Sequence, residues 1–416
     1  MNLLKTGLFS AVATAAKLVS AFAVMKIVAV IAGPQGVAQF GQFMSVASLM
    51  IVFAGGGIAA GMIKYIAEYQ KDDRKLIGLI KSGLFYTLCS AVFICLVALY
   101  YSSEIAVLLM GGKEFQLLIM ALALSQFFVA LYNFIVAIIN GMMDVKRLAG
   151  IHVVGALIGL APVCLLSYYY NLSGALYGYL LGQGLMLVVA MVAFVRSPYF
   201  ILAYFVPSFD SEHCKRLAIF SLMTLTSAFL APLVQIVVRN ILVDKFSWES
   251  VGYWQAVSKV SDAYLLFITM AISIYYLPKL SATVENKGIV DEIKRAYVFL
   301  MPVVLLMAAF VYLLRDEITV LLFSNEFQGA LYLYAPQLLG DVVKIASFIL
   351  SYVMLAKAMT RTFLASEIAF SLMYVIWVFL LTDMFGLIGS MYAFILNYVL
   401  YFFFTLLVVS RFLRSA

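Results

Sequence analysis

Long apolar runs separated by short polar segments follow one another along the whole chain. A helix needs about 20 consecutive apolar residues to cross the hydrocarbon core of a bilayer. The pattern predicts about twelve membrane-spanning helices, at residues 6–32, 37–66, 80–101, 115–140, 148–169, 173–195, 216–243, 250–280, 295–314, 328–356, 360–381 and 386–410. The expected fold class is an all-α integral membrane protein. The first run is long and carries two lysines, so it reads as a span and not as a cleaved signal peptide.

Composition supports the membrane assignment. The 416 residues are 65% hydrophobic and 11% charged, whereas soluble domains are about 45–50% apolar and about 25% charged.

Four cysteines and two histidines form no metal-ligand spacing, so we expect no metal and no cofactor. The net charge of +7 follows membrane sidedness and does not indicate nucleic-acid binding. Without a Gly-rich phosphate loop or long outer loops, the chain does not look like an enzyme.

The basic residues predict the orientation of the chain. With the N-terminus in the cytoplasm, nineteen of the 27 Lys and Arg residues fall on the cytoplasmic side. Three fall outside, and five lie within the spans. By the positive-inside rule, both termini are expected in the cytoplasm.

The two halves of the chain resemble each other. Residues 103–110 (SEIAVLLM) align with residues 316–323 (DEITVLLF), and the tripeptide Glu-Phe-Gln recurs at 114–116 and 326–328. An even number of spans per half predicts two parallel six-helix lobes around a central cavity. The expected divisions are an N-terminal lobe at 1–195, a cytoplasmic linker at 196–215 and a C-terminal lobe at 216–416.

Eight charged residues lie inside the apolar runs. A charge at membrane depth costs at least about 2.5–3.5 kcal/mol, so it normally faces protein or a water-filled cavity. We expect the basic residues to bind an anionic substrate in the lumen: Lys17, Lys26, Arg239, Lys259 and Lys344. The acidic residues are candidates for ion coupling: Asp262, Asp341 and Glu367.

Uncharged polar residues recur at helical spacing beside these charges. Such spacing places side chains on one face of a helix. We expect four of them to line the lumen: Gln126, Asn133, Gln255 and Gln337.

Several readings stay open at this point. The pairs Lys259–Asp262 and Asp341–Lys344 have the spacing of ion pairs that neutralise each other. Arg239 lies near the outer end of its span, where its side chain could extend to the interface. The glycines at 55–57 suit either close helix packing or a hinge.

Four segments resemble the Wzx-type lipid-linked oligosaccharide flippases: 251–262 (VGYWQAVSKVSD), 277–281 (LPKLS), 324–327 (SNEF) and 337–344 (QLLGDVVK). That family belongs to the multidrug/oligosaccharidyl-lipid/polysaccharide exporter superfamily. The resemblance implies an inner-membrane location and alternating access with a cationic lumen. Its implied cargo is an undecaprenyl-pyrophosphate-linked oligosaccharide, such as lipid III of enterobacterial common antigen.

The resemblance also implies possible partners, namely the polymerase and chain-length proteins of the same pathway. The alternatives are a cation-coupled drug exporter of the same superfamily, which prefers an acidic pocket, and a membrane oligosaccharide polymerase, which needs longer outer loops.

The orientation can be tested with a reporter fused after Ala416. We expect a reporter that is active only in the cytoplasm to be active there, because the positive-inside rule places the C-terminus inside. A C-terminal reporter that is active only in the periplasm would overturn the topology.

Overall fold

The computed structural model describes residues 3–415 and is 91% helical, with no strand among these residues. In chain order the α-helices are α1 (Leu3–Ala54), α2 (Ala59–Tyr69), α3 (Asp73–Tyr100), α4 (Ser102–Ile105), α5 (Gln116–Gly141), α6 (Val145–Val195), α7 (Ser211–Lys245), α8 (Trp248–Ala271), α9 (Leu277–Ala282), α10 (Asn286–Leu313), α11 (Arg315–Leu322), α12 (Tyr334–Ala356), α13 (Thr360–Phe385) and α14 (Gly389–Ser415). Short π or 3-10 turns lie between some of them: η1 (Ala106–Met110), η2 (Lys113–Phe115), η3 (Leu202–Phe205), η4 (Ile272–Tyr276), η5 (Asn325–Leu333) and η6 (Gly386–Ile388). The all-α membrane class predicted from the sequence is confirmed.

Within this described part, eight helical stretches are long and apolar enough to cross a membrane. Three of them hold 44, 51 and 55 residues, far more than the roughly 20 that one crossing needs. Each contains a backbone break: at Gly33 (φ 61°) in α1, at Asn171 (φ 50°) in α6, and at Gly386 (φ 68°) between α13 and α14. These breaks fall where the sequence predicts span boundaries. The count of twelve spans stays a prediction.

The predicted span at 37–66 is interrupted at the glycines that the sequence analysis singled out. The helix stops at Ala54 and restarts at Ala59, because Gly56 and Gly57 have φ values of 62° and 65°. A Cβ at Gly56 would lie 2.7 Å from the ring of Tyr86, and one at Gly57 would lie 3.0 Å from the carbonyl oxygen of Ser221. Close packing therefore requires glycine at both positions. A hinge at this break stays a hypothesis.

The chain divides into two compact units. Unit 1 comprises residues 1–32 and 39–236, and unit 2 comprises residues 33–38 and 237–416. The chain passes from one unit to the other inside α1 and inside α7. The two units are defined by which residues contact each other, whereas the expected lobes are defined by the internal sequence repeat. The lobe boundaries at 195 and 216 therefore stay predictions.

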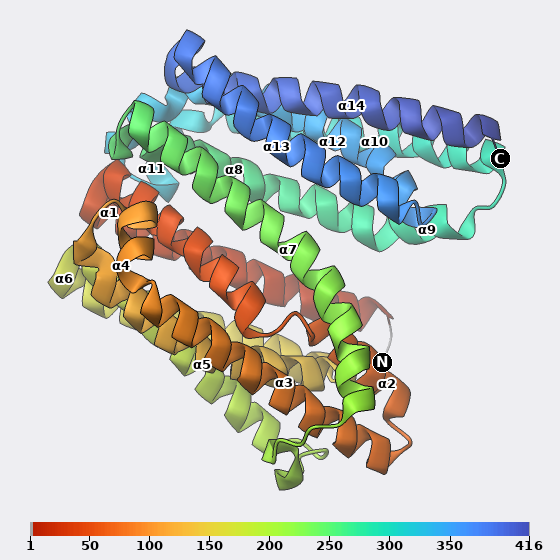
Figure 1. Cartoon of the computed structure of the whole chain (residues 1–416). Helices are drawn as coiled ribbons and strands as arrows, with labels where there is room; N and C mark the ends of the chain where they lie inside the picture. The colour runs from red at the N-terminus through yellow and green to blue at the C-terminus, as the bar shows by residue number, and fades with distance from the viewer. Residues whose placement is uncertain (1–2, 416) are drawn as a thin grey trace. The chain divides into compact units, whose positions relative to one another are not determined.

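The core of unit 1 forms where α5 packs against α2, α3 and α6 (Figure 1). Its fully buried side chains include Met62, Leu79 and Ile138. The segment expected as a linker takes part in this core, because Tyr204 in η3 is only 1% exposed and stacks on Phe194 at 6.4 Å between ring centroids. Residues 202–205 are therefore anchored to unit 1 through an aromatic side chain.

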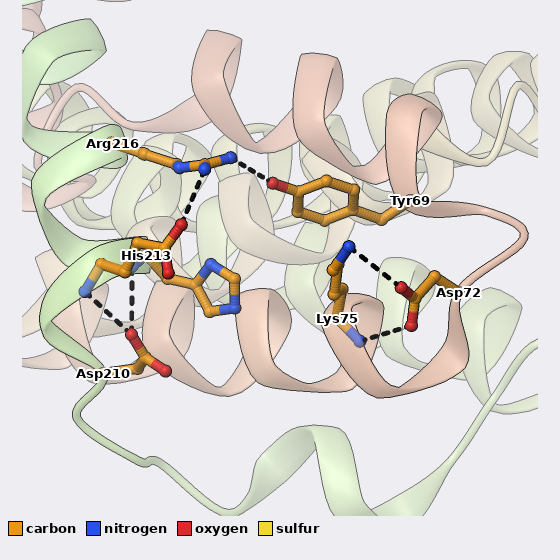
Figure 2. Close-up of polar contacts among 7 residues, drawn as sticks. Tyr69, Asp72, Lys75, Asp210, His213 and Arg216 are labelled. Atoms are coloured by element: carbon orange, nitrogen blue, oxygen red, sulfur yellow. Dashed lines mark hydrogen bonds and ion pairs between the residues drawn. The ribbon is translucent and has the colours of Figure 1, made fainter.

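Two aspartates begin helices at one end of unit 1 (Figure 2). Asp72 accepts a hydrogen bond from the backbone N–H of Lys75 at 3.1 Å and caps α3. Asp210 accepts from the backbone N–H groups of Glu212 and His213, at 2.8 and 3.2 Å, at the start of α7. Hydrogen bonds from these backbone donors favour the ionised carboxylate, so they hold the pKa of both side chains below the usual range.

Arg216 ties α7 to α2 beside these caps (Figure 2). Its Nη1 donates to the hydroxyl of Tyr69 at 2.5 Å, and its Nη2 pairs with Glu212 at 2.7 Å. The guanidinium also lies 5.8 Å from the ring centroid of Tyr65, within the range of a cation–π contact. The first turns of α7 are thus fixed to unit 1 by polar and aromatic contacts together.

In unit 2, α12 packs against α10, α13 and α14 (Figure 1). The segment 33–38 of α1 packs against α8 so closely that a Cβ on Gly252 would lie 2.0 Å from the carbonyl oxygen of Pro34. Since backbone cannot move aside as a flexible side chain can, glycine is the only residue that fits at position 252.

We expect Gly252→Ala to destabilise the protein by about 1–3 kcal/mol, because the added methyl overpacks a backbone contact. Gly150→Ala is the matched control, since a Cβ there meets nothing within 4 Å. The control should be neutral or stabilise by up to about 1 kcal/mol through helix propensity. Thermal unfolding in detergent measures both changes. Equal melting temperatures for the two variants would contradict the close contact.

Candidate functional site

Asp341 on α12 is the centre of a buried polar network in unit 2. Its side chain is 0% exposed. Three uncharged side chains donate hydrogen bonds to its carboxylate: Ser261, Tyr264 and Gln337. The donor–acceptor distances are 2.7 Å to each oxygen from Ser261 Oγ, 2.7 Å from Tyr264 OH and 3.0 Å from Gln337 Nε2. A buried carboxylate is tolerated when such donors replace water.

The network joins two helices that each carry residues expected to face the lumen. Ser261 and Tyr264 come from α8, and Gln337 and Asp341 come from α12. Gln337 also donates to Ser261 Oγ at 3.2 Å, so the network closes on itself. The structure thus brings together two residues predicted to face a lumen, but it encloses both of them in protein.

Lys344 lies one turn along α12 from Asp341, and its ammonium group is surrounded by aromatic rings. The ring centroids within 5.8 Å of Nζ are those of Phe348, Phe394 and Tyr398. Cation–π attraction at this range offsets part of the cost of placing a charge in an apolar bundle. The expected Asp341–Lys344 ion pair does not occur among the ion pairs of the described residues.

The second expected pair does form. Lys259 Nζ lies 3.6 Å from the carboxylate of Asp262, one turn along α8. Their side chains are 41% and 60% exposed. An ion pair with this exposure contributes little to stability and can open readily. Both residues are therefore accessible to a solute, unlike Asp341.

Arg239 is enclosed in unit 2 and does not extend to an interface. It is 2% exposed, and its Nη2 donates to Oε1 of Gln255 at 2.7 Å. Its guanidinium also lies 5.8 Å from the ring centroid of Trp254. The alternative in which Arg239 reaches the membrane surface is wrong. Gln255, at 2% exposure, holds this arginine in place.

Glu367 is exposed on α13 and accepts a hydrogen bond from the hydroxyl of Tyr401 on α14, at 3.4 Å. It completes the expected charged residues in unit 2. Of the eight charged residues expected inside the apolar runs, that unit contains three basic ones, Arg239, Lys259 and Lys344, and three acidic ones, Asp262, Asp341 and Glu367. Their formal charges sum to zero.

Unit 1 has a different balance. Of the eight charged residues expected inside the apolar runs, it holds Lys17 and Lys26, which are both basic. Lys17 is exposed and Lys26 is partly buried, both on α1. The surplus of two positive charges among the eight expected site residues therefore lies wholly in unit 1.

The polar residues expected on α5 of unit 1 behave differently from each other. Gln126 is fully buried, and its Nε2 donates to the carbonyl oxygen of Leu122 at 3.0 Å. Asn133, seven residues later, is partly exposed. Asn133 is therefore the more accessible of the two.

Several residues near the charges were not expected from the sequence. Ser261 and Tyr264 were missed because uncharged hydroxyl groups carry no cost that marks them in an apolar run. Tyr398 and Tyr401 were missed because an uncharged tyrosine does not stand out in a chain with 26 of them. The three-residue step between these two tyrosines, which places them on one face of α14, was the available signal.

In the described part of the chain, no group of three or more His, Cys, Asp or Glu residues is placed to hold a metal ion.

The network predicts a distinct effect for each substitution of Asp341. Asp341→Ala should lower the free energy of unfolding by about 1–3 kcal/mol, because it leaves buried donors without an acceptor. Asp341→Asn keeps an acceptor and should cost less. Chemical denaturation of the purified variants in detergent measures the difference. An alanine variant as stable as the wild type would contradict the network.

Comparison with known proteins shows a matching family model and two full-length relatives. A family model described as "Polysaccharide biosynthesis protein" matches residues 15–331. The lipid III flippase of Escherichia coli (strain K12) is 33% identical over 407 residues, which cover 97% of each chain. A lipid III flippase of Shigella flexneri matches to the same extent.

Solved structures show the same fold. An inward-facing multidrug resistance MATE family transporter of the MOP superfamily superposes with a TM-score of 0.83 at 16% identity, covering 96% of both chains. The lipid II flippase MurJ, in an inward closed conformation, superposes with a TM-score of 0.77 at 17% identity, covering 97% of this chain and 87% of the other. At these identities the likeness concerns the fold alone. The match to the family model and the full-length relatives show that the chain belongs to the polysaccharide biosynthesis protein family.

Proposed function

We propose that this multi-pass membrane protein flips a lipid-linked oligosaccharide from the cytoplasmic to the periplasmic leaflet of the inner membrane. The observation that carries the proposal is the 33% identity to lipid III flippases over 97% of the chain. The expected cargo is therefore lipid III, and the expected process is alternating access without a chemical step. We also propose that both termini are cytoplasmic and that the polymerase and chain-length proteins of the pathway are partners.

The charges of the apolar helices fit this cargo. A lipid pyrophosphate is anionic, and moving it through a low-dielectric slab is costly unless positive charge accompanies it. Unit 1 supplies Lys17 and Lys26, and unit 2 supplies two further lysines. Among these, Lys344 is held by aromatic rings and Lys259 by an exposed and therefore labile ion pair.

The acidic residues divide by accessibility. Asp262 and Glu367 are exposed, so either could exchange a proton or a cation with solvent during transport. Asp341 is already satisfied by three donors and supports the packing of α8 against α12. We therefore propose Asp262 and Glu367 as the coupling candidates ahead of Asp341.

The second candidate is a cation-coupled drug exporter, which the MATE structure with the same fold brings into consideration. A cationic drug would be repelled by the surplus positive charge of unit 1, so this candidate fits less well.

Deleting the gene and analysing the lipid-linked glycans tests the function. We expect lipid III to accumulate in the cytoplasmic leaflet and common antigen to disappear from the cell surface. Accumulation of a different lipid-linked glycan would contradict the cargo. Drug sensitivity with normal antigen display would favour the exporter instead.

Complementation with lysine variants tests the cationic site. Lys259→Ala and Lys344→Ala should each reduce antigen display about tenfold or more, because each removes one charge-assisted contact worth about 1.5–3 kcal/mol. Lys287→Ala, at an exposed lysine near the start of α10, is the matched control and should restore display fully. Membrane levels of each variant are measured in parallel. Normal display by both lumen variants would remove the cationic argument.

A further inference from the structure

Three aromatic rings lie beside the ammonium group of Lys344. They belong to Phe348 on α12 and to Phe394 and Tyr398 on α14. The ring centroids are 5.8, 5.6 and 5.6 Å from Nζ, in that order. All four residues are partly exposed, so a ligand can reach this group of side chains. The structure thus places one cation next to several flat apolar faces.

The rings beside Lys344 belong to a larger aromatic surface on α12, α13 and α14, which pack on one another (Figure 1). Phe394 and Tyr398 are four residues apart on one face of α14, with their centroids 4.8 Å apart. Phe394 also meets Tyr374 of α13 at 6.2 Å. Both contacts are edge-to-face, at 69° and 74° between the ring planes. In such a pair, the ring that offers its edge keeps both of its faces free of that partner.

Glycine at position 340 allows Phe394 to lie against α12. A Cβ at Gly340 would be 2.4 Å from Cδ1 of Phe394, which is too close for two carbon atoms. Gly340 precedes Lys344 by four residues, so the two lie one turn apart on the same face of the helix. Close backbone packing therefore keeps the Phe394 ring near the lysine.

The ammonium of Lys344 has no carboxylate partner at short range. Asp262 and Asp341 attract it electrostatically, but none of the ion pairs among the described residues includes Lys344. Its distances to the ring centroids are near the outer limit of about 6 Å for a cation–π contact. A charge-assisted hydrogen bond to an anionic oxygen is stronger. A phosphoryl oxygen can therefore replace these ring contacts.

A pyranose sugar fits the aromatic faces next to such a phosphoryl group. Its C–H groups carry small positive partial charges, which are attracted by the negative face of an aromatic ring. Ligand sites combine aromatic side chains with a few charged or polar groups that fix the orientation of the ligand. In a pyrophosphate-linked glycan the first sugar is joined directly to the pyrophosphate. A site that binds the pyrophosphate at Lys344 therefore brings this sugar to the neighbouring rings.

We propose that Phe394 and Tyr398 stack against the first sugar of the lipid-linked oligosaccharide while Lys344 binds the adjoining phosphoryl group. The identity of the ligand rests on the proposed function. The two rings then determine specificity, because they favour a lipid that carries a sugar over the same lipid pyrophosphate without one.

A structural alternative is that the rings only offset the cost of burying the lysine. In that case, removing a ring would destabilise the protein and would change the binding of every anionic lipid alike, through Lys344. Contact with a sugar predicts a loss of affinity that occurs only when the lipid carries the sugar. The two roles therefore differ in one set of binding measurements.

The experiment uses the purified full chain in lipid nanodiscs, with binding measured by native mass spectrometry. The probes are lipid III, undecaprenyl pyrophosphate that carries one N-acetylglucosamine, and undecaprenyl pyrophosphate itself. The variants are Phe394→Leu, Tyr398→Leu, Tyr398→Phe and Lys344→Gln. Phe403→Leu is the matched control, at an exposed phenylalanine of the same helix whose ring pairs with Phe402. Melting temperatures are measured in parallel.

Phe394→Leu and Tyr398→Leu should each weaken binding of both sugar-bearing probes about threefold to tenfold, the loss expected for one aromatic contact. Their binding of undecaprenyl pyrophosphate should not change. Tyr398→Phe keeps the ring and should bind all three probes like the wild type, as should the control. Lys344→Gln should weaken binding of all three probes about tenfold or more, because each of them carries the pyrophosphate.

An equal loss with all three probes in the leucine variants would overturn the sugar contact and support the structural alternative. Wild-type affinity for lipid III in both leucine variants would also overturn it. A loss with lipid III but not with the single-sugar probe would contradict contact with the first sugar. If Phe394→Leu does not fold, Tyr398→Leu decides by the same comparison. A wild-type protein that binds none of the three probes counts against the proposed function instead.

Discussion

The cost of placing a charge in an apolar bundle is the constraint on which the arrangement of these helices depends. In unit 2, a different set of contacts offsets the cost of burying each charge. Asp341 receives three hydrogen bonds from uncharged donors, and Arg239 is held by an amide and an indole ring. Lys344 is enclosed by aromatic rings. Because the partners come from α8, α12 and α14, satisfying these charges also fixes how the helices pack.

The same constraint links structure to function through the sum of the charges. Among the eight charged residues expected inside the apolar runs, unit 2 holds three basic and three acidic residues, whereas unit 1 holds two lysines. Balanced charges can be retained in a folded protein by mutual attraction and hydrogen bonding. An excess of positive charge within a membrane costs free energy unless a negatively charged ligand binds there and neutralises it. An anionic lipid-linked sugar is such a ligand.

Much of the fold could be predicted from the sequence, because the apolar runs are long and the breaks at Gly33, Asn171 and Gly386 lie at their boundaries. The glycines at 55–57 marked the interruption of the second run, but the sequence left open whether they serve close packing or a hinge, because glycine suits both. Of the candidate site, the charged residues were found because each is conspicuous in apolar sequence. Their partners were not, because which hydroxyl or ring reaches a given charge depends on packing between helices far apart in the chain. Ser261 and Tyr264 could be recognised only from the packing of α8 against α12.

The central claim is that the chain moves an anionic lipid-linked oligosaccharide across the bilayer, and reconstituted flipping tests it most directly. Purified protein is placed in liposomes that contain labelled lipid III in both leaflets, and the fraction accessible to an impermeant sugar-oxidising reagent is followed in time. We predict that the inner-leaflet pool becomes accessible with the wild-type protein, and that an uncharged polyprenyl glycoside in the same liposomes stays protected. Accessibility of lipid III equal to that in protein-free liposomes would contradict the account.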